Sequence, residues 1–214
     1  MRARFSILVA VTCSVVATTA ATANGAREGR ADVPACEELL SVRQAKEVLR
    51  EPLADILTRE VVGTTRNCDY IGGKKNAPVQ RTLGITWGPW AELRKRAPSF
   101  AKSTVCPVSK SACQDMKKVA TTRRDLDSFK YLEQALSKAG NVRRLRSPVF
   151  EGNPVLVWRP SDATGAAAAM GWVLAYDVNS ASLLETFCTD STVNTPDVAC
   201  AIAAAERVYE NVKS

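Results

Sequence analysis

Six cysteines between residues 36 and 200 constrain this chain more than any other feature of its sequence. An even number of cysteines in an exported chain is typical of disulfides formed in an oxidising compartment. Six cysteines allow 15 pairings, and we favour the sequential one because each of its pairs encloses a short, polar or turn-rich loop. The sequence therefore predicts three bridges: Cys36 with Cys68, Cys106 with Cys113, and Cys188 with Cys200.

Metal ligation is the alternative use of these cysteines. The chain has no histidine and no Cys-x-x-Cys sequence, so a zinc site would need four thiolates at unsuitable spacings. Histidine is also the residue on which general acid–base and triad chemistry mostly depend. We accordingly expect no metal, no cofactor and no enzymatic activity.

The first 23 residues have the pattern of a secretory signal peptide. Arg2 and Arg4 precede an apolar run over residues 5 to 17, and Ala21-Thr22-Ala23 offers the small residues that a signal peptidase recognises. A membrane anchor is the alternative, but a spanning helix needs roughly 20 mainly apolar residues and threonines dilute this run. We predict cleavage after Ala23, which removes the seventh cysteine, Cys13, and leaves a secreted chain without an integral membrane segment.

The mature chain divides into a tail and one domain. Residues 24 to 34 are small and charged without periodicity, which predicts a flexible tail. Ser41 and Gln44 form a capping box for a helix over residues 42 to 50, and residues 59 to 70 suggest two short strands. In the next predicted strand, residues 81 to 87, Leu83, Ile85 and Trp87 alternate with polar or small residues, as a half-buried antiparallel strand requires.

The second half of the chain shows two helical patterns, then strands, then a closing helix. The first helical pattern covers residues 90 to 103 with a kink at Pro98, and the second covers residues 127 to 139. In the closing helix Thr195 is the expected cap, Pro196 the first helical residue, and Asp197 an acid that favours the helix dipole. The predicted strands between these helices form an antiparallel meander over residues 142 to 145, 148 to 150, 155 to 158, 171 to 176 and 183 to 188, with the alanines at 166 to 169 in a loop. Residues 35 to 214 are thus predicted to be a single α+β domain in which helices pack on an antiparallel sheet.

One pattern resembles a known family. It consists of Cys36-x-x-Leu39-Leu40-Ser41, a helix that ends near Leu49, and Cys68-Asp69-Tyr70 before an alternating strand. This is similar to the small exported and lipoprotein domains of unknown function that are common in actinobacteria, and residues 35 to 87 and 142 to 213 fit their plan. The resemblance implies a fold of the PsbP and Mog1 type and transfers no catalytic residue. The lipid-anchor cysteine of the family is missing here, which implies a free protein, and residues 90 to 140 are longer than the usual middle.

Basic residues concentrate in the middle of the chain. Residues 91 to 146 contain 14 basic and 5 acidic side chains, a net charge of +9. Such a segment indicates either a surface for an anionic partner, namely a wall polymer, lipid head groups or an acidic protein, or a solvated face that keeps the protein soluble. Nucleic acid is a poorer candidate, because an export signal separates the chain from it and few aromatic residues interleave with the basic ones. The candidate binding residues are Arg94, Lys95, Arg96, Lys117, Lys118, Arg123, Arg124, Arg143, Arg144 and Arg146.

Two further motifs offer alternative functions. The tryptophans at positions 87, 90, 158 and 172 either anchor the core or line a pocket for a small ligand. Ser99-Phe100-Ala101-Lys102 matches the Ser-x-x-Lys of penicillin-interacting serine enzymes, but the chain has neither the Lys-Thr-Gly nor the Ser-Asp-Asn motif of that class. We therefore predict a secreted, non-enzymatic binding module with a basic contact face; a small-ligand carrier and a serine acyl hydrolase using Ser99 and Lys102 are the alternatives. The sequence gives no indication of oligomeric state.

Overall fold

The structure is a computed structural model that describes residues 34–61, 64–74, 81–161, 171–190 and 197–213. The predicted signal peptide, nearly all of the predicted tail, the alanine loop, Thr195 and Pro196 lie outside these residues. Within the described part, the predicted α+β class with an antiparallel sheet and packed helices is confirmed.

One seven-stranded sheet organises the described residues, in the order β1-β2-β3-β7-β6-β5-β4, with every neighbouring pair antiparallel. The strands β4 to β7 follow one another as the predicted meander, and β3 joins them by pairing with β7. This places β7, one of the last elements of the chain, at the centre of the sheet. The strands are β1 (Leu53–Val61), β2 (Thr65–Gly72), β3 (Arg81–Pro89), β4 (Gly140–Arg144), β5 (Val155–Pro160), β6 (Gly171–Asp177) and β7 (Ser182–Asp190).

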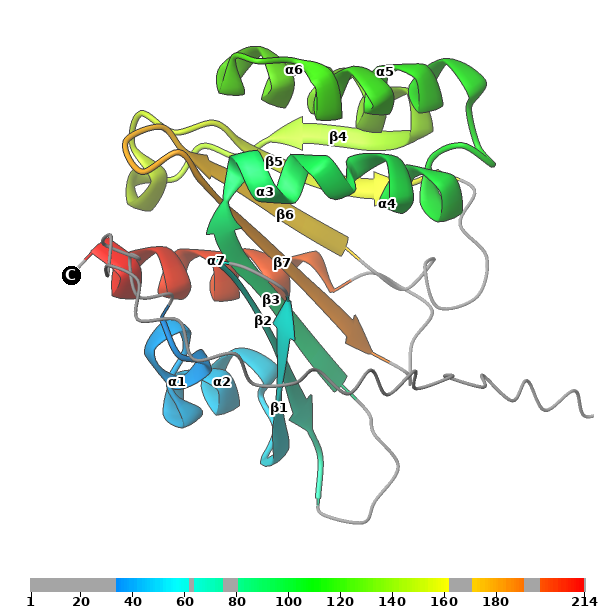
Figure 1. Cartoon of the computed structure of the whole chain (residues 1–214). Coiled ribbons are helices and arrows are strands. Elements are labelled where there is room, and N and C mark those ends of the chain that lie inside the picture. The colour runs from blue at the N-terminus through cyan, green and yellow to red at the C-terminus, as the bar shows by residue number, and fades with distance from the viewer. Residues whose placement is uncertain (1–33, 62–63, 75–80, 162–170, 191–196, 214) are drawn as a thin grey trace, which may run out of the picture. The chain divides into compact units, whose positions relative to one another are not determined.

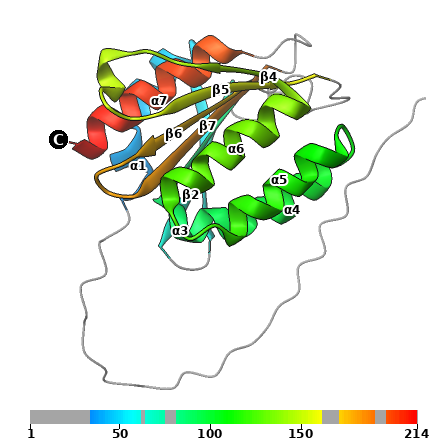
Figure 2. The same ribbon diagram turned by 90° about the horizontal axis from the view of Figure 1, so that it is seen from above.

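Helices cover both faces of the sheet, so the fold has three layers (Figures 1 and 2). One face carries α1 (Cys36–Leu39), α2 (Val42–Leu49) and α7 (Val198–Lys213). The other carries the segment that connects β3 to β4. That segment consists of α3 (Trp90–Leu93), the 3₁₀ helix η1 (Arg94–Arg96), α4 (Ala97–Thr104), α5 (Lys110–Thr121) and α6 (Asp125–Ala139).

The first of these layers is held by the Cys36 to Tyr70 region. Leu83 and Ile85 of β3 are buried against α1, α2 and α7, as the alternating pattern predicted. The buried Tyr70 hydroxyl donates to the carbonyl oxygens of Cys36 and Leu40, and burial raises the pKa of this phenol. Tyr70, two residues after Cys68, therefore fixes the turn between α1 and α2 to the sheet.

All three predicted disulfides are confirmed. The S–S distances are 2.06 Å for Cys36–Cys68, 2.05 Å for Cys106–Cys113 and 2.01 Å for Cys188–Cys200. The first joins α1 to β2 and the last joins α7 to β7, while the second closes a loop within the helical segment between β3 and β4.

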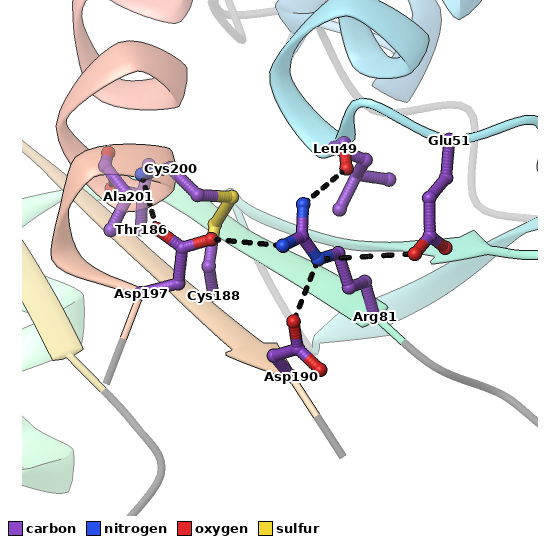
Figure 3. The surroundings of a disulfide bond; sticks show 9 residues. All are labelled: Leu49, Glu51, Arg81, Thr186, Cys188, Asp190, Asp197, Cys200 and Ala201. Carbon is purple, nitrogen blue, oxygen red and sulfur yellow. Dashed lines mark hydrogen bonds and ion pairs between the residues drawn. A yellow bond between two sulfur atoms is a disulfide. The ribbon is translucent and has the colours of Figure 1, made fainter. Parts of the chain in front are cut away.

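Next to the Cys188–Cys200 bridge, Arg81 ties three elements together (Figure 3). Its Nε lies 2.9 Å from Asp190 Oδ2, and one terminal nitrogen donates to the Leu49 carbonyl oxygen at 2.8 Å. Asp197 lies 4.0 Å from the same guanidinium, and the acids around Arg81 raise its pKa. The start of α7 and the end of α2 are thereby held against β3 and β7.

Several predicted elements need correction. Residues 148–150 are not a strand but a 3₁₀ helix, η2 (Pro148–Phe150), because Ser147 accepts from the Val149 N–H and proline fits the first helical turn. Among the described residues the closing helix, α7, begins at Val198, and Asp197 Oδ1 accepts from the Cys200 N–H at 3.0 Å as a capping residue does, while the predicted cap Thr195 and Pro196 lie outside the described residues. The segment between Cys106 and Cys113 was predicted as a loop, but its last part belongs to α5, which begins at Lys110. Helix α6 begins at Asp125, two residues earlier than predicted.

Gly140 joins α6 to β4 where no side chain fits. A Cβ atom on Gly140 would lie 2.1 Å from the Arg159 carbonyl oxygen and 2.7 Å from Trp158 Nε1. Gly140→Ala is therefore expected to lower the free energy of unfolding by about 2 kcal/mol, because the added methyl group would clash with the backbone of β5 and push that strand away. Urea unfolding measures this, and Gln134→Ala on the exposed face of α6 is the control. An unchanged unfolding midpoint in Gly140→Ala would contradict the close packing of α6 on β5.

Candidate functional site: a cavity under helices α3 to α6

A cavity of about 240 Å³ lies between the sheet and the helices α3 to α6. Its walls are mainly apolar, and they come from both the sheet and the helical segment. Because protein interiors are close-packed, a space of this size with aromatic walls is the feature of the fold that most resembles a ligand site. The main apolar contributors are Leu93, Phe100, Met116, Leu132, Trp158 and Trp172.

The two-residue period of the strands builds the floor of this cavity. On β7, Leu183 and Glu185 point toward α3 to α6, whereas Leu184 belongs to the opposite core under α7. Thr86 of β3 and Leu174 of β6 pair with Glu185 in the sheet and line the cavity beside it. Thr86, on the polar side of the alternating pattern of β3, is therefore partly covered by the helices and lines the cavity.

Three of the four tryptophans line the cavity and also anchor the core. Trp158 and Trp172 have ring centroids 4.9 Å apart, and Trp158 Nε1 donates to the Leu136 carbonyl oxygen at 3.1 Å. Trp90 packs edge-on against Phe129 with ring centroids 6.0 Å apart. Trp87 lies on the other face of the sheet, against the core under α7. The alternative of a tryptophan-lined pocket therefore describes Trp90, Trp158 and Trp172, but not Trp87.

Of the described residues that line the cavity, Glu185 is the one acid. It is located on the central strand of the sheet, and desolvation by the surrounding protein raises the pKa of its carboxyl group to about 7. Among the described residues no hydrogen bond or ion pair engages this carboxyl group. An unpartnered acid at such a position is unusual, because buried ionisable groups are normally paired.

Other polar groups surround the cavity. Asn67 Oδ1 and Trp90 Nε1 belong to lining residues and are buried without a hydrogen-bond partner. An unsatisfied buried group of this kind costs about 1 to 3 kcal/mol, so it usually marks strain or an absent partner. Arg96 of η1, which is partly exposed, is the other ionisable residue of the lining.

Half of the ten predicted basic residues have roles in the local structure. Arg94 lies 3.0 Å from Asp125 and donates to the Thr122 carbonyl oxygen, which holds η1 against the turn between α5 and α6. Lys118 shares the buried Asp115 with Lys138, and both lysines lower the pKa of that acid. The other residues of this group are Lys95, paired with Glu92, Arg144, paired through two bonds with Glu133, and Arg96, which lines the cavity.

The other half are exposed and unpaired among the described residues: Lys117, Arg123, Arg124, Arg143 and Arg146. They are located on different elements, namely α5, the turn before α6, and β4 with the residues that follow it. Arg143 has a neighbour that the sequence did not indicate. Asn141 pairs with Arg159 of β5, and these two residues line a second hollow together with Arg143.

The serine and lysine of the Ser-x-x-Lys motif lie on α4 and are both exposed. Phe100, between them, contacts Trp158 edge-on and lines the cavity, but neither Ser99 nor Lys102 belongs to the lining. Among the described residues no group of histidine, cysteine, aspartate or glutamate side chains is suited to hold a metal ion. Nor does this part of the chain contain a helix of the length and apolarity that crossing a membrane requires.

Comparisons of the chain with known protein families, with curated proteins and with solved structures found no match. The cavity and its residues are therefore the basis for assigning a function.

Proposed function

We propose that this protein binds a small, largely apolar molecule in the cavity between its sheet and helices α3 to α6. The observation that carries the proposal is an apolar space of about 240 Å³ whose floor holds one unpartnered acid, Glu185. Binding pockets typically combine apolar and aromatic walls with few polar groups that orient the ligand. Trp90, Trp158 and Trp172 supply the aromatic walls here, and the arrangement lacks the histidine or thiolate on which most hydrolytic mechanisms depend.

We further propose that the protein acts outside the cytoplasm, as a free carrier or sensor of its ligand. Three disulfides within one domain support an oxidising compartment, and the signal-peptide pattern of residues 1 to 23 supports export. The resemblance to actinobacterial exported domains and the PsbP and Mog1 type of fold stay predictions, supported by the residue pattern around Cys36 and Cys68.

Filling the cavity is expected to abolish binding. Ala97 lies in the lining at the start of α4, and Ala97→Trp would place an indole in the space that the ligand occupies. The probe is N-phenyl-1-naphthylamine, a neutral apolar dye whose fluorescence rises in an apolar site. We expect saturable binding to the wild-type protein and at least a tenfold weaker affinity in Ala97→Trp.

Ala91→Trp is the matched control. Ala91 is exposed on α3, so this substitution adds the same indole chromophore outside the cavity. Far-ultraviolet circular dichroism checks that both variants remain folded. Absence of saturable binding to the wild-type protein, or equal loss in both variants, would refute a ligand site at this position.

Two arginines that line one hollow favour a second candidate function, contact with an anionic partner. Arg143 and Arg159 line one hollow on β4 and β5, and no acid pairs with either among the described residues. Two guanidinium groups at one hollow favour a phosphate or carboxylate group more than scattered surface charges do. Of the ten basic residues predicted to bind an anionic partner, this proposal keeps Arg143 alone. It adds Arg159, which was not among the predicted binding residues.

Charge reversal at this hollow tests the second candidate. Arg143→Glu with Arg159→Glu is expected to weaken binding of polyphosphate about tenfold or more at low salt, because two attractive charges become repulsive. Binding to the wild-type protein should weaken steeply as sodium chloride rises from 0.05 to 0.5 M, by screening. Arg123→Glu with Arg124→Glu makes the same change in net charge elsewhere, so an equal loss in that control would show that only overall charge matters.

A further inference from the structure

We infer that the ligand of the cavity carries a protonated amine, which pairs with Glu185. This inference rests on the proposed ligand-binding function and specifies the chemical class of the ligand. It follows from the position of Glu185, from the absence of a partner for its carboxyl group, and from the aromatic rings around it.

Glu185 is placed so that a ligand can reach it only through the cavity. It is located on β7 in the middle of the sheet, with Thr86 on one side and Leu174 on the other, and both of these residues also line the cavity. Helices α3 to α6 cover this face of the sheet. Glu185 is only partly accessible, but unlike Asn67 Oδ1 and Trp90 Nε1 its carboxyl oxygens are not among the fully buried atoms, so a ligand in the cavity can contact them.

Within the part of the chain that the structure describes, no cation pairs with this acid. Arg96 is the other ionisable residue of the lining, and no ion pair joins it to Glu185. The remaining charged residues of α3 and η1 are engaged elsewhere: Arg94 pairs with Asp125, and Lys95 with Glu92. A ligand cation would therefore be the first positive charge to contact the carboxylate, and it would relieve the cost of burying that charge unpaired.

The walls of the cavity also favour a cation with an apolar body. Indole rings attract cations to their faces, and three of the four tryptophans of the chain line this space. A neutral ligand would gain only a hydrogen bond from Glu185. An anionic ligand would meet repulsion from Glu185 and would depend on Arg96 alone.

Three ligands of one skeleton separate these possibilities: 2-phenylethylamine, 2-phenylethanol and 3-phenylpropionate. Isothermal titration calorimetry at pH 8 is expected to show that the amine binds about tenfold or more tightly than the alcohol, since a charged hydrogen bond adds roughly that factor. Glu185→Gln should remove the advantage of the amine over the alcohol. Arg96→Gln is the matched variant, because it changes the other charge of the lining and should leave that advantage in place.

The outcomes distinguish this inference from the proposal on which it rests. An alcohol that binds as tightly as the amine, or an acid that binds most tightly and depends on Arg96, would overturn the amine assignment while the ligand site stands. Failure of all three ligands and of N-phenyl-1-naphthylamine to bind would overturn both. Loss of the amine preference in Arg96→Gln but not in Glu185→Gln would also refute the assignment.

Discussion

Glu185→Gln is expected to raise the free energy of unfolding by about 3 kcal/mol at pH 8 and to leave it nearly unchanged at pH 4. The ordinary pKa of a glutamate is 4.5, and burial raises that of Glu185 to about 7, so the folded state holds this proton more tightly than the unfolded state does. Below pH 4.5 the carboxyl group is neutral in both states. As the pH rises from 4.5 to 7, the unfolded chain ionises while the folded protein resists, and stability falls across this range.

The measurement is the difference in unfolding free energy between the wild-type protein and the variant, from urea titrations at pH 4, 6 and 8. Taking the difference cancels the titration of the other acids. Glu151→Gln, at an exposed acid after η2, is the control and should change stability by less than about 0.5 kcal/mol at every pH. A pH-independent difference for Glu185→Gln would mean that the carboxyl group is solvated or paired, and would remove the electrostatic basis of the amine site.

Removal of the Cys36–Cys68 bridge should produce the other large effect. This disulfide joins residues 32 positions apart, and losing the constraint on the unfolded chain costs about 4 kcal/mol for a loop of that length. We therefore expect the double substitution Cys36→Ser with Cys68→Ser to lower the free energy of unfolding by about 4 kcal/mol. Since both sulfur atoms are buried against α2, α7 and the sheet, the serine hydroxyls add to the loss.

Cys106→Ser with Cys113→Ser is the matched comparison, because its bridge spans only 7 positions. The same reasoning gives a loss of about 2.5 kcal/mol for this shorter loop. Urea unfolding of both double variants ranks the two bridges. If the shorter loop costs as much as the longer one, packing around the sulfur atoms rather than chain entropy dominates.

The parts of the fold that depend on local pattern were predicted from the sequence. The three disulfides followed from the spacing of the cysteines, and the alternation of Leu83 and Ile85 identified a strand with one face in the core. Prediction failed where a capping residue and a proline next to a short apolar run decide its conformation. Residues 148–150 are apolar enough for a strand, but the Ser147 cap and Pro148 make them a 3₁₀ helix.

The candidate site was harder to predict because it depends on which strands are neighbours. The pairing of β3 with β7 joins residues about 100 positions apart, and no local pattern indicates it. Glu185 did carry a signal, an acid in the middle of a strand between Leu184 and Phe187, but its meaning depends on the helices that cover that face. That Arg143 and Arg159 line one hollow likewise depends on the register of β4 and β5, which pairs Arg143 with Val157 and Asn141 with Arg159.

The central position of β7 has a consequence for how the chain reaches its folded state. Because β3 and β6 both pair with residues 182–190, the two halves of the sheet cannot join until most of the chain is present. Contacts between such distant residues slow folding, since a long loop must close before they form. If the chain is exported as its signal-peptide pattern predicts, we expect it to stay unfolded while it crosses the membrane and to become compact only after its last 30 or so residues arrive. In that case the order of the strands would delay folding until translocation is nearly complete, and the disulfides would form in the compartment where the thiols can be oxidised.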